Sequence, residues 1–166
     1  SGVSEPMQTV TRIVAIRHGE TAWNVDTRIQ GHLDIPLNAT GRWQASRMAE
    51  ALADEGISAV YSSDLSRALE TAEALCTVLG LDVVTDNRLR ERAFGAFEAL
   101  TFTEIESRWP AEARRWTQRE PEFAPDGGES LNDFYARCVR AVHQIAEAHP
   151  GQTIAVVAHG GVMDCL

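Results

Sequence analysis

The sequence predicts an α/β fold of three layers, with helices on both faces of a mostly parallel central sheet. Two aliphatic, β-branched runs, at 11–16 and 153–158, are typical of strands buried on both faces. Segments with helical periodicity alternate with these and other short apolar runs. Because alternating strands and helices build parallel sheets with helices on both faces, we expect this architecture.

The chain has 166 residues and 44% hydrophobic residues, the size and apolar content of one compact domain. We expect residues 1–10 to be a leader or tag-derived segment and residues 11–166 to form a single domain. The sequence ends at Leu166 within a new apolar helix. We therefore also expect this domain to be truncated at its C-terminus.

The expected elements follow in order. After the strand at 11–16, residues 17–36 form a long loop of the kind that often carries function. A helix begins at Asn38, packs through a stripe at Trp43, Met48, Ala51 and Leu52, and ends at Gly56. The remaining elements are a strand at 57–62, a helix at 65–79 capped by Asp64, a strand at 81–85, short helices at 101–109 and 111–119, a helix from Ser130 to about His149, and the strand at 153–158.

The charged residues exclude several classes of chemistry. The formal net charge is −9, which disfavours binding to nucleic acid or to acidic membranes. All 15 basic residues are arginines. Schiff-base chemistry, pyridoxal phosphate, a Walker A loop and a kinase-type lysine are therefore excluded, and an anion site must be built from arginines.

Three cysteines without CxxC spacing, at 76, 138 and 165, favour neither a disulfide framework nor a zinc ribbon. The sequence has no secretory signal pattern and no apolar run of the roughly 18 residues that a membrane helix needs. We expect a cytoplasmic protein.

Two histidines follow the two most apolar strands, each with glycine after it. His18 and His159 would face each other, because the carboxyl ends of parallel strands line one crevice. Glycine permits close backbone approach, and the helix that starts after Gly160 offers free N–H groups. Arg17 beside His18 disfavours a metal ion and favours an anion, most simply phosphate. We therefore expect no metal site.

Further candidates come from the helix at 65–79 and the segment after 85. Arg67 lies at a helix N-terminus, where a cation needs solvent or an anionic partner, and it would clamp a phosphate if it faces the crevice. Glu91 at the mouth of an anion site would have its pKa raised by the substrate's charge, which suits a proton donor. Glu98 is an equally acidic rival, and the segment alone does not separate the two.

Three motifs in this order resemble the histidine phosphatase superfamily, with its phosphoglycerate mutase-like fold. They are R-H-G-E-T at 17–21, S-S-D-L-S-R-A at 62–68 and A-H-G-G at 158–161. Asn24, the Gln30–Gly31 pair, L-R-E-R-A-F-G at 89–95 and G-E-S at 128–130 extend the resemblance over almost the whole chain.

The resemblance implies a metal-independent phosphatase that works through a phosphohistidine. It makes His18 the nucleophile and Glu91 the proton donor, in the branch where glycine follows the second histidine. Arg17, Arg67 and His159 would hold the phosphoryl oxygens. The residues implied to bind substrate are Arg17, Asn24, Gln30, Gly31, Arg67, His159 and Gly160. No cofactor is implied, and the partner is a small phosphorylated metabolite.

Two alternatives stay open. A cofactor-dependent phosphoglycerate mutase would use an arginine pair such as Arg114–Arg115, but the family's mutases carry a central insertion and a substrate lysine that this chain lacks. A non-catalytic phospho-ligand-binding module is the other, although every matched catalytic position is filled. The chain departs from the family's W-E-G at Phe97-Glu98-Ala99, where the turn is expected to differ. An exposed sheet edge would also suit a homodimer.

Overall fold

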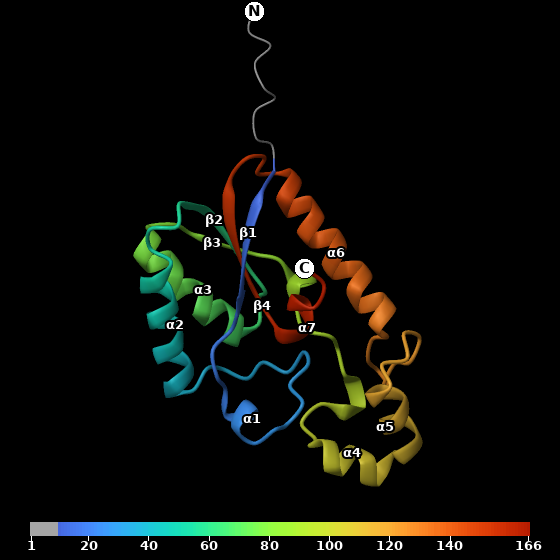
Figure 1. Ribbon diagram of the computed structural model, residues 1–166. Coiled ribbons are helices and arrows are strands. Elements are labelled where there is room, and N and C mark those ends of the chain that lie inside the picture. Colours follow the sequence, from blue (N-terminus) through green and yellow to red (C-terminus); the bar gives the residue numbers. More distant parts are fainter. Residues whose placement is uncertain (1–9) are drawn as a thin grey trace, which may run out of the picture.

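The computed structural model describes residues 10–166 (Figure 1). Apart from Val10, the predicted leader at 1–10 lies outside the described residues. The elements are β1 (Arg12–Arg17), α1 (Ala22–Val25), α2 (Ala39–Ala51), β2 (Ile57–Ser62), α3 (Ser66–Leu79), β3 (Val83–Thr85), η1 (Asn87–Leu89), η2 (Gly95–Phe97), α4 (Phe102–Arg108), α5 (Pro110–Thr117), α6 (Leu131–Glu147), β4 (Thr153–Ala158) and α7 (Gly160–Met163).

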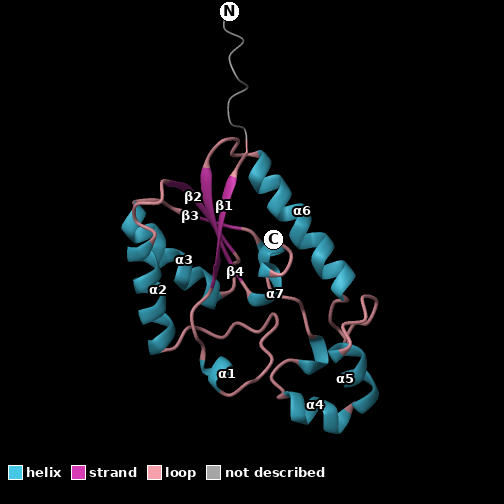
Figure 2. Cartoon of the chain, in the orientation of Figure 1, coloured by secondary structure: helices cyan, strands magenta, loops and turns pink. Residues whose placement is uncertain are grey.

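The four named strands form one sheet in the order β1-β4-β2-β3, and every pairing is parallel. The prediction of a mostly parallel sheet is therefore confirmed. The strand that comes last in the sequence lies between the first two. β1 and β4 therefore lie side by side, with their carboxyl ends at the same end of the sheet (Figure 2).

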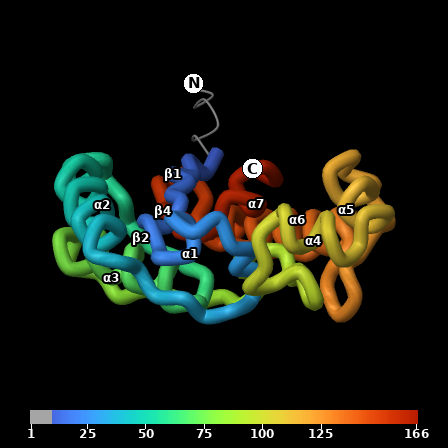
Figure 3. Tube along the Cα trace, turned by 90° about the horizontal axis from the view of Figure 1, so that it is seen from below, coloured from blue at the N-terminus to red at the C-terminus, as the bar shows by residue number. Residues whose placement is uncertain are grey.

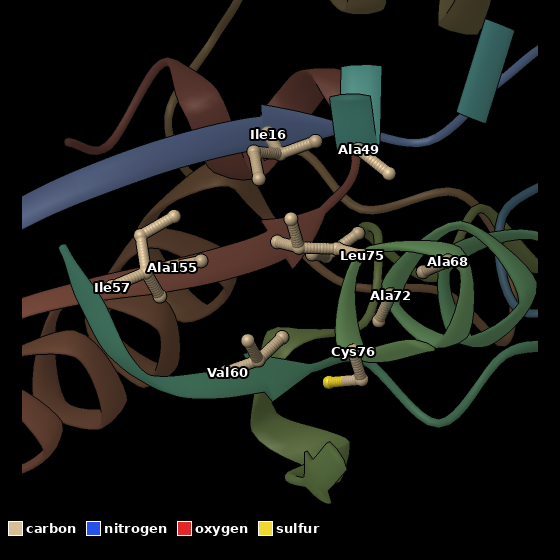
Figure 4. Packing of buried hydrophobic residues seen from close by; sticks show 10 residues of the cluster. Ile16, Ala49, Ile57, Val60, Ala68, Ala72, Leu75, Cys76 and Ala155 are labelled. Carbon is tan, nitrogen blue, oxygen red and sulfur yellow. The ribbon is translucent and has the colours of Figure 1, made fainter. Parts of the chain in front are cut away.

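The alternating side chains of β4 join two cores. Ala155 and Val157 pack with α2 and α3, in the cluster seen from close by in Figure 4. Ile154 and Val156 pack against α6 on the opposite face. Figure 3 shows α2 and α3 on one side of the strands and α6 on the other, which is the expected three-layer arrangement.

Burial of the first strand differs from the prediction. β4 is central and its residues 154–158 are all buried. β1 is an edge strand in which only Ile16 is buried and Ala15 is exposed. The aliphatic pattern is the same in both strands, so pattern alone does not separate a central strand from an edge strand.

The packing stripe of α2 was predicted only in part, because Met48 and Leu52 pack against the core whereas Trp43 and Ala51 are exposed. Trp43 is 64% exposed, whereas Gly41, Ala45 and Ala49 are buried. These small residues let α2 lie close to α3 and to the sheet.

Two local features of the loop after β1 were missed. The short helix α1 lies within it, and Thr21 and Asn24 cap that helix reciprocally. Asp34, not Asp64, caps α3, since its carboxylate accepts hydrogen bonds from the N–H and the hydroxyl of Ser66 at 2.6 and 3.0 Å. Asp64 instead forms a bidentate ion pair with Arg90.

Residues 94–123 form a separate small lobe around Phe97, Ile105, Ala113 and Phe123. It contains η2, α4 and α5, and it lies beyond the carboxyl ends of the strands (Figures 1 and 2). No helix among residues 10–166 has the length and apolar character needed to cross a membrane.

Ala99 takes the left-handed conformation that glycine normally occupies, with φ 72°. Its N–H donates to Ile29 at 2.8 Å, and its carbonyl accepts from Arg28 at 2.9 Å, so both backbone contacts hold the turn in place. In the turn at Phe97-Glu98-Ala99, alanine thus takes the left-handed conformation at the position where W-E-G has glycine, and its Cβ makes that conformation strained.

We predict that Ala99→Gly raises the free energy of unfolding by about 1 kcal/mol, because the left-handed region is strained for any residue with a Cβ. Urea unfolding measures the change. Ala96→Gly is the matched control, since Ala96 is exposed and has no positive φ, and we expect it to destabilise. Equal effects of the two substitutions would contradict strain at Ala99.

Candidate active site

The pairing of β1 with β4 brings the two histidines together. Arg17 is in register with Ala158, and the N–H of His18 donates to the Ala158 carbonyl at 3.1 Å. His18 and His159 therefore leave neighbouring strands at the same level. Their ring centroids lie 5.2 Å apart with an interplanar angle of 62°. The two histidines thus lie close together at the carboxyl ends of β1 and β4, as predicted.

A hydrogen bond to the backbone sets the tautomer of His18. Its Nδ1 lies 2.6 Å from the carbonyl oxygen of Gly19. A carbonyl can only accept, so Nδ1 carries the proton and donates it. In the neutral ring Nε2 then has a free lone pair, which is the requirement for a nucleophile.

Burial and neighbouring cations keep this ring neutral. Burial is the largest cause that lowers the pKa of His18 to about 4, and the charges of Arg67 and Arg17 lower it further against the opposing effect of the Gly19 carbonyl. The pKa of His159 is lowered well below its usual value by burial first and then by Arg67 and His18. Both rings are thus neutral at neutral pH.

Arg67 is buried, with only 1% of its surface exposed. It lies in the first turn of α3, and its terminal nitrogens donate to the carbonyls of Leu33 at 2.6 Å and Gly31 at 2.7 Å. Carbonyls stabilise a cation without neutralising it. Burial lowers the pKa of Arg67 to about 10, so the guanidinium stays charged at neutral pH.

Two buried polar atoms lack a partner within residues 10–166, and both belong to this cluster. They are Nε of Arg67 and Nδ1 of His159. The other ring nitrogen of His159 lies 2.8 Å from the hydroxyl of Ser63. Buried polar atoms without partners are rare and call for a ligand or water.

Of the two glycines after His159, Gly161 makes room for a charged group, whereas a Cβ at Gly160 would make only ordinary van der Waals contact. A Cβ on Gly160 would lie 3.4 Å from the central carbon of the Arg17 guanidinium. A Cβ on Gly161 would lie 2.3 Å from a carboxylate oxygen of Glu91. The Gly161 N–H donates to that carboxylate at 3.2 Å. Arg17 and Glu91 thus both reach the backbone that follows His159.

A cavity of about 360 Å³ opens beside His18. Arg17 lines it, as does Asn24, whose Oδ1 accepts from the N–H of Thr21. Gln44 lines both this cavity and an adjacent one of about 250 Å³.

None of the other predicted binding residues lines either cavity. The side-chain carbonyl of Gln30 accepts from the hydroxyl of Thr21 at 2.8 Å. The carbonyl of Gly31 accepts from Arg67. Gln30 and Gly31 thus fix the conformation of the loop whose carbonyls bind Arg67.

The two rival carboxylates have different surroundings. Glu98 accepts hydrogen bonds from the N–H groups of His32 at 3.1 Å and Phe94 at 2.8 Å, which ties the loop of Gly31 to the small lobe. Glu91 reaches the start of α7 beside His159. The geometry favours Glu91 over Glu98 as the carboxyl group at the site.

Several residues at the site were missed from the sequence. Ser63 and Thr71 contact the two histidine segments, with Thr71 accepting from the Gly19 N–H at 3.2 Å. Ser63 lies inside the S-S-D-L-S-R-A motif, which gave a signal for it. Thr71 and Gln44 lie mid-helix, where no local pattern marks them. Arg137 and Glu129 were missed as well.

The arginine pair of the mutase alternative lies on a different element from the two histidines. Arg114 and Arg115 are on α5, where Arg115 pairs with Glu120 at 3.1 Å, and neither lines the cavities beside His18. Within residues 10–166 no three His, Cys, Asp or Glu side chains are grouped so that they could hold a metal ion.

The family model described as histidine phosphatase superfamily (branch 1) matches residues 13–166. Phosphoglycerate mutase-like protein 4 of Arabidopsis thaliana is 46% identical over 157 residues, which are 93% of this chain and 68% of that protein. A metal-independent phosphoserine phosphatase of the same plant is 40% identical, with 93% of this chain and 66% of that protein covered.

A solved structure agrees with the sequence comparison. The mycobacterial glucosyl-3-phosphoglycerate phosphatase in complex with VO3 superposes with a TM-score of 0.85 at 38% identity, over 93% of this chain and 78% of that one. The chain thus spans about two thirds to three quarters of the length of these relatives.

We predict that the free energy of unfolding falls as the pH drops from 6.5 toward 4. Over this range the unfolded chain takes up a proton at His18, whereas the folded chain, with the His18 pKa lowered to about 4, does not. His18→Asn should make the fall shallower, and His159 should account for part of what is left.

Urea titrations at several pH values between 4 and 7 measure this dependence. His143→Asn, which removes an exposed histidine of α6, is the matched control. Parallel curves for the wild-type chain and His18→Asn would show that burial does not hold His18 neutral.

Proposed function

The chain belongs to branch 1 of the histidine phosphatase superfamily, and from that premise we propose that it hydrolyses small-metabolite phosphomonoesters with His18 as the nucleophile. The observation that carries the proposal is the neutral His18 ring, whose Nδ1 donates to Gly19 while its Nε2 is free beside the buried Arg67 and the exposed Arg17. A nucleophile, fixed positive charge and a nearby carboxyl group are what a phosphoryl transfer of this kind requires.

In the first step, Nε2 of His18 attacks phosphorus, and the bond from phosphorus to the leaving oxygen breaks. Arg17 and Arg67 stabilise the charge that develops on the phosphoryl oxygens. A bound phosphoryl group would accept from the unpartnered Nε of Arg67, and from Nδ1 of His159 in the tautomer in which Nε2 accepts from the Ser63 hydroxyl. The Asn24 amide group and the Gly160 N–H assist from the rim.

Glu91 supplies the proton that the leaving oxygen takes, which leaves a carboxylate. In the second step a water molecule attacks phosphorus, and Glu91 accepts its proton as the bond between nitrogen and phosphorus breaks. Phosphate leaves, and both His18 and Glu91 return to their starting states.

We propose that this chemistry needs no metal ion. The guanidinium groups of Arg17 and Arg67 take the place of a Lewis acid, because both are permanent cations beside the nucleophile. The relative named as a metal-independent phosphoserine phosphatase supports the same conclusion.

A phosphatase fits the site better than the two alternatives. A mutase would use Arg114 and Arg115, but these lie on α5 in the small lobe, where Arg115 pairs with Glu120. A non-catalytic binder would not need a free Nε2 in the correct tautomer. The relatives are named for phosphoserine and glucosyl-3-phosphoglycerate, so these two phosphate esters are the first to screen.

We further propose a cytoplasmic protein that acts on a free metabolite and not on nucleic acid or membranes. The net charge of −9 and the buried, unpaired thiols of Cys76 and Cys138 support this. The outer edges of β1 and β3 have no strand partner among the described residues, so either edge suits pairing with a second copy. Cell fractionation and light scattering test the location and the oligomeric state.

We predict that the chain releases phosphate from p-nitrophenyl phosphate in excess EDTA. His18→Ala should lower turnover by about a thousandfold or more, because the nucleophile is lost. Acid-labile, alkali-stable phosphate on the protein should disappear in the same variant. His143→Ala is the control. Near-normal turnover of His18→Ala would refute the nucleophile assignment, and EDTA-sensitive turnover would refute metal independence.

We predict that Glu91→Gln slows phenyl phosphate by about a hundredfold and p-nitrophenyl phosphate by less than about fivefold, because a good leaving group needs little proton donation. Steady-state kinetics on both esters measure the difference. Glu106→Gln, on an exposed residue of α4, is the matched control. Equal losses on both esters would make Glu91 a structural residue.

A further inference from the structure

The segment that carries Glu91 has no strand partner among the described residues. Residues 88–93, here called the Glu91 segment, run from the end of η1 toward η2 and pair with no strand. Backbone carbonyls in such a segment need partners from elsewhere. Three of them, at Arg88, Arg90 and Glu91, accept hydrogen bonds from one side chain, Arg137 of α6.

Arg137 uses its full set of donors. One terminal nitrogen donates to the Arg88 and Arg90 carbonyls at 2.8 Å each, and the other donates to the Glu91 carbonyl at 2.7 Å. Nε and the second terminal nitrogen also donate to the Glu129 carboxylate, at 2.7 Å each. A guanidinium has five N–H groups, and these five hydrogen bonds use them all.

Glu129 fixes this guanidinium and the far end of the Glu91 segment together. Its carboxylate accepts from the N–H of Ala93 at 2.8 Å, and its own N–H donates to the Ala93 carbonyl. Burial alone would raise the pKa of Glu129, but the hydrogen bonds from Arg137 and Ala93 hold it below its usual value. The pair therefore stays ionised.

A second side chain holds the same backbone carbonyl from the loop after β1. Nε2 of His32 lies 2.8 Å from the Glu91 carbonyl, so that carbonyl accepts from both His32 and Arg137. The Glu91 carboxylate in turn accepts from the N–H of Arg92 at 2.9 Å and that of Gly161 at 3.2 Å. Both the backbone and the side chain of Glu91 are thus fixed relative to His159.

We propose that Arg137, held by Glu129, is a positioning residue for proton donation by Glu91. Its hydrogen bonds satisfy backbone carbonyls of the Glu91 segment that a neighbouring strand would otherwise satisfy. In this way it holds the Glu91 carboxyl group where that group can reach the leaving oxygen. The inference rests on the proposed function, because it assumes that Glu91 is the proton donor. In this proposal Arg137 acts through Glu91 and does not itself contact the substrate.

The test compares Arg137→Met with the wild-type chain on a series of aryl phosphates with increasingly poor leaving groups. A misplaced acid matters most where the leaving oxygen needs its proton most. We expect kcat for phenyl phosphate to fall by at least about tenfold, and kcat for p-nitrophenyl phosphate to fall by less than about threefold. KM should change little for either ester.

Three further variants sharpen the result. Arg140→Met removes an exposed arginine of the same helix and should change neither ester. Arg137→Lys keeps the charge but not the planar set of five donors, and we expect the same selective loss, smaller in size. Adding Arg137→Met to Glu91→Gln should cause no further selective loss, because the proton donor is already gone.

The outcomes are distinguishable. No turnover of either ester by the wild-type chain would refute the proposed function. Turnover by the wild-type chain, with equal losses on all esters in Arg137→Met or an additive double variant, would refute the positioning role alone. If Arg137→Met does not fold, as judged by circular dichroism, Arg137→Lys decides. Failure of both to fold would assign Arg137 to stability and overturn the proposal.

Discussion

The parallel pairing of β1 with β4 is the constraint on which the site depends. These strands are separated by well over a hundred residues, and their register places His18 beside the end of Ala158. A shift by one residue would turn one histidine to the opposite face of the sheet, since successive side chains alternate. The packing of Ile154 and Val156 against α6, and of Ala155 and Val157 against α3, prevents such a shift.

Burial then gives these groups their chemical character. The same desolvation that disfavours a charged His18 also acts on Arg67, but with different results. A histidine begins with a pKa near neutrality, so burial lowers that pKa and keeps the ring neutral. An arginine begins so high that it remains a cation after the decrease. One environment thus produces both a neutral imidazole and fixed positive charge within the same small volume.

The sequence was a good guide to elements whose signals are local. Apolar runs and glycine stops placed β2, α3 and β4 to within one residue, and the two matching strand ends led to His18 and His159. It was a poor guide to burial, because β1 and β4 have the same pattern and only β4 is central. Trp43 was misplaced for a related reason. A packing stripe was judged by the size of its residues, whereas α2 packs through Gly41, Ala45 and Ala49.

The residues that the sequence could not reveal act over long separations. Asp34 caps a helix that begins 32 residues later. Arg137 lies 46 residues from the carbonyl of Glu91 and on a different element. Neither belongs to a local pattern, because a half-buried arginine that donates to backbone carbonyls looks in the sequence like any surface arginine of an amphipathic helix.

Such long-range contacts bear on the choice between Glu91 and Glu98, which composition could not make. Glu98 uses its carboxylate on backbone groups of the loop and the small lobe. The backbone around Glu91 is held by Arg137 and His32, so its own carboxylate can extend to the glycine after Gly160. Each carboxylate accepts from two backbone N–H groups, so the two differ in position: only that of Glu91 reaches the backbone that follows His159.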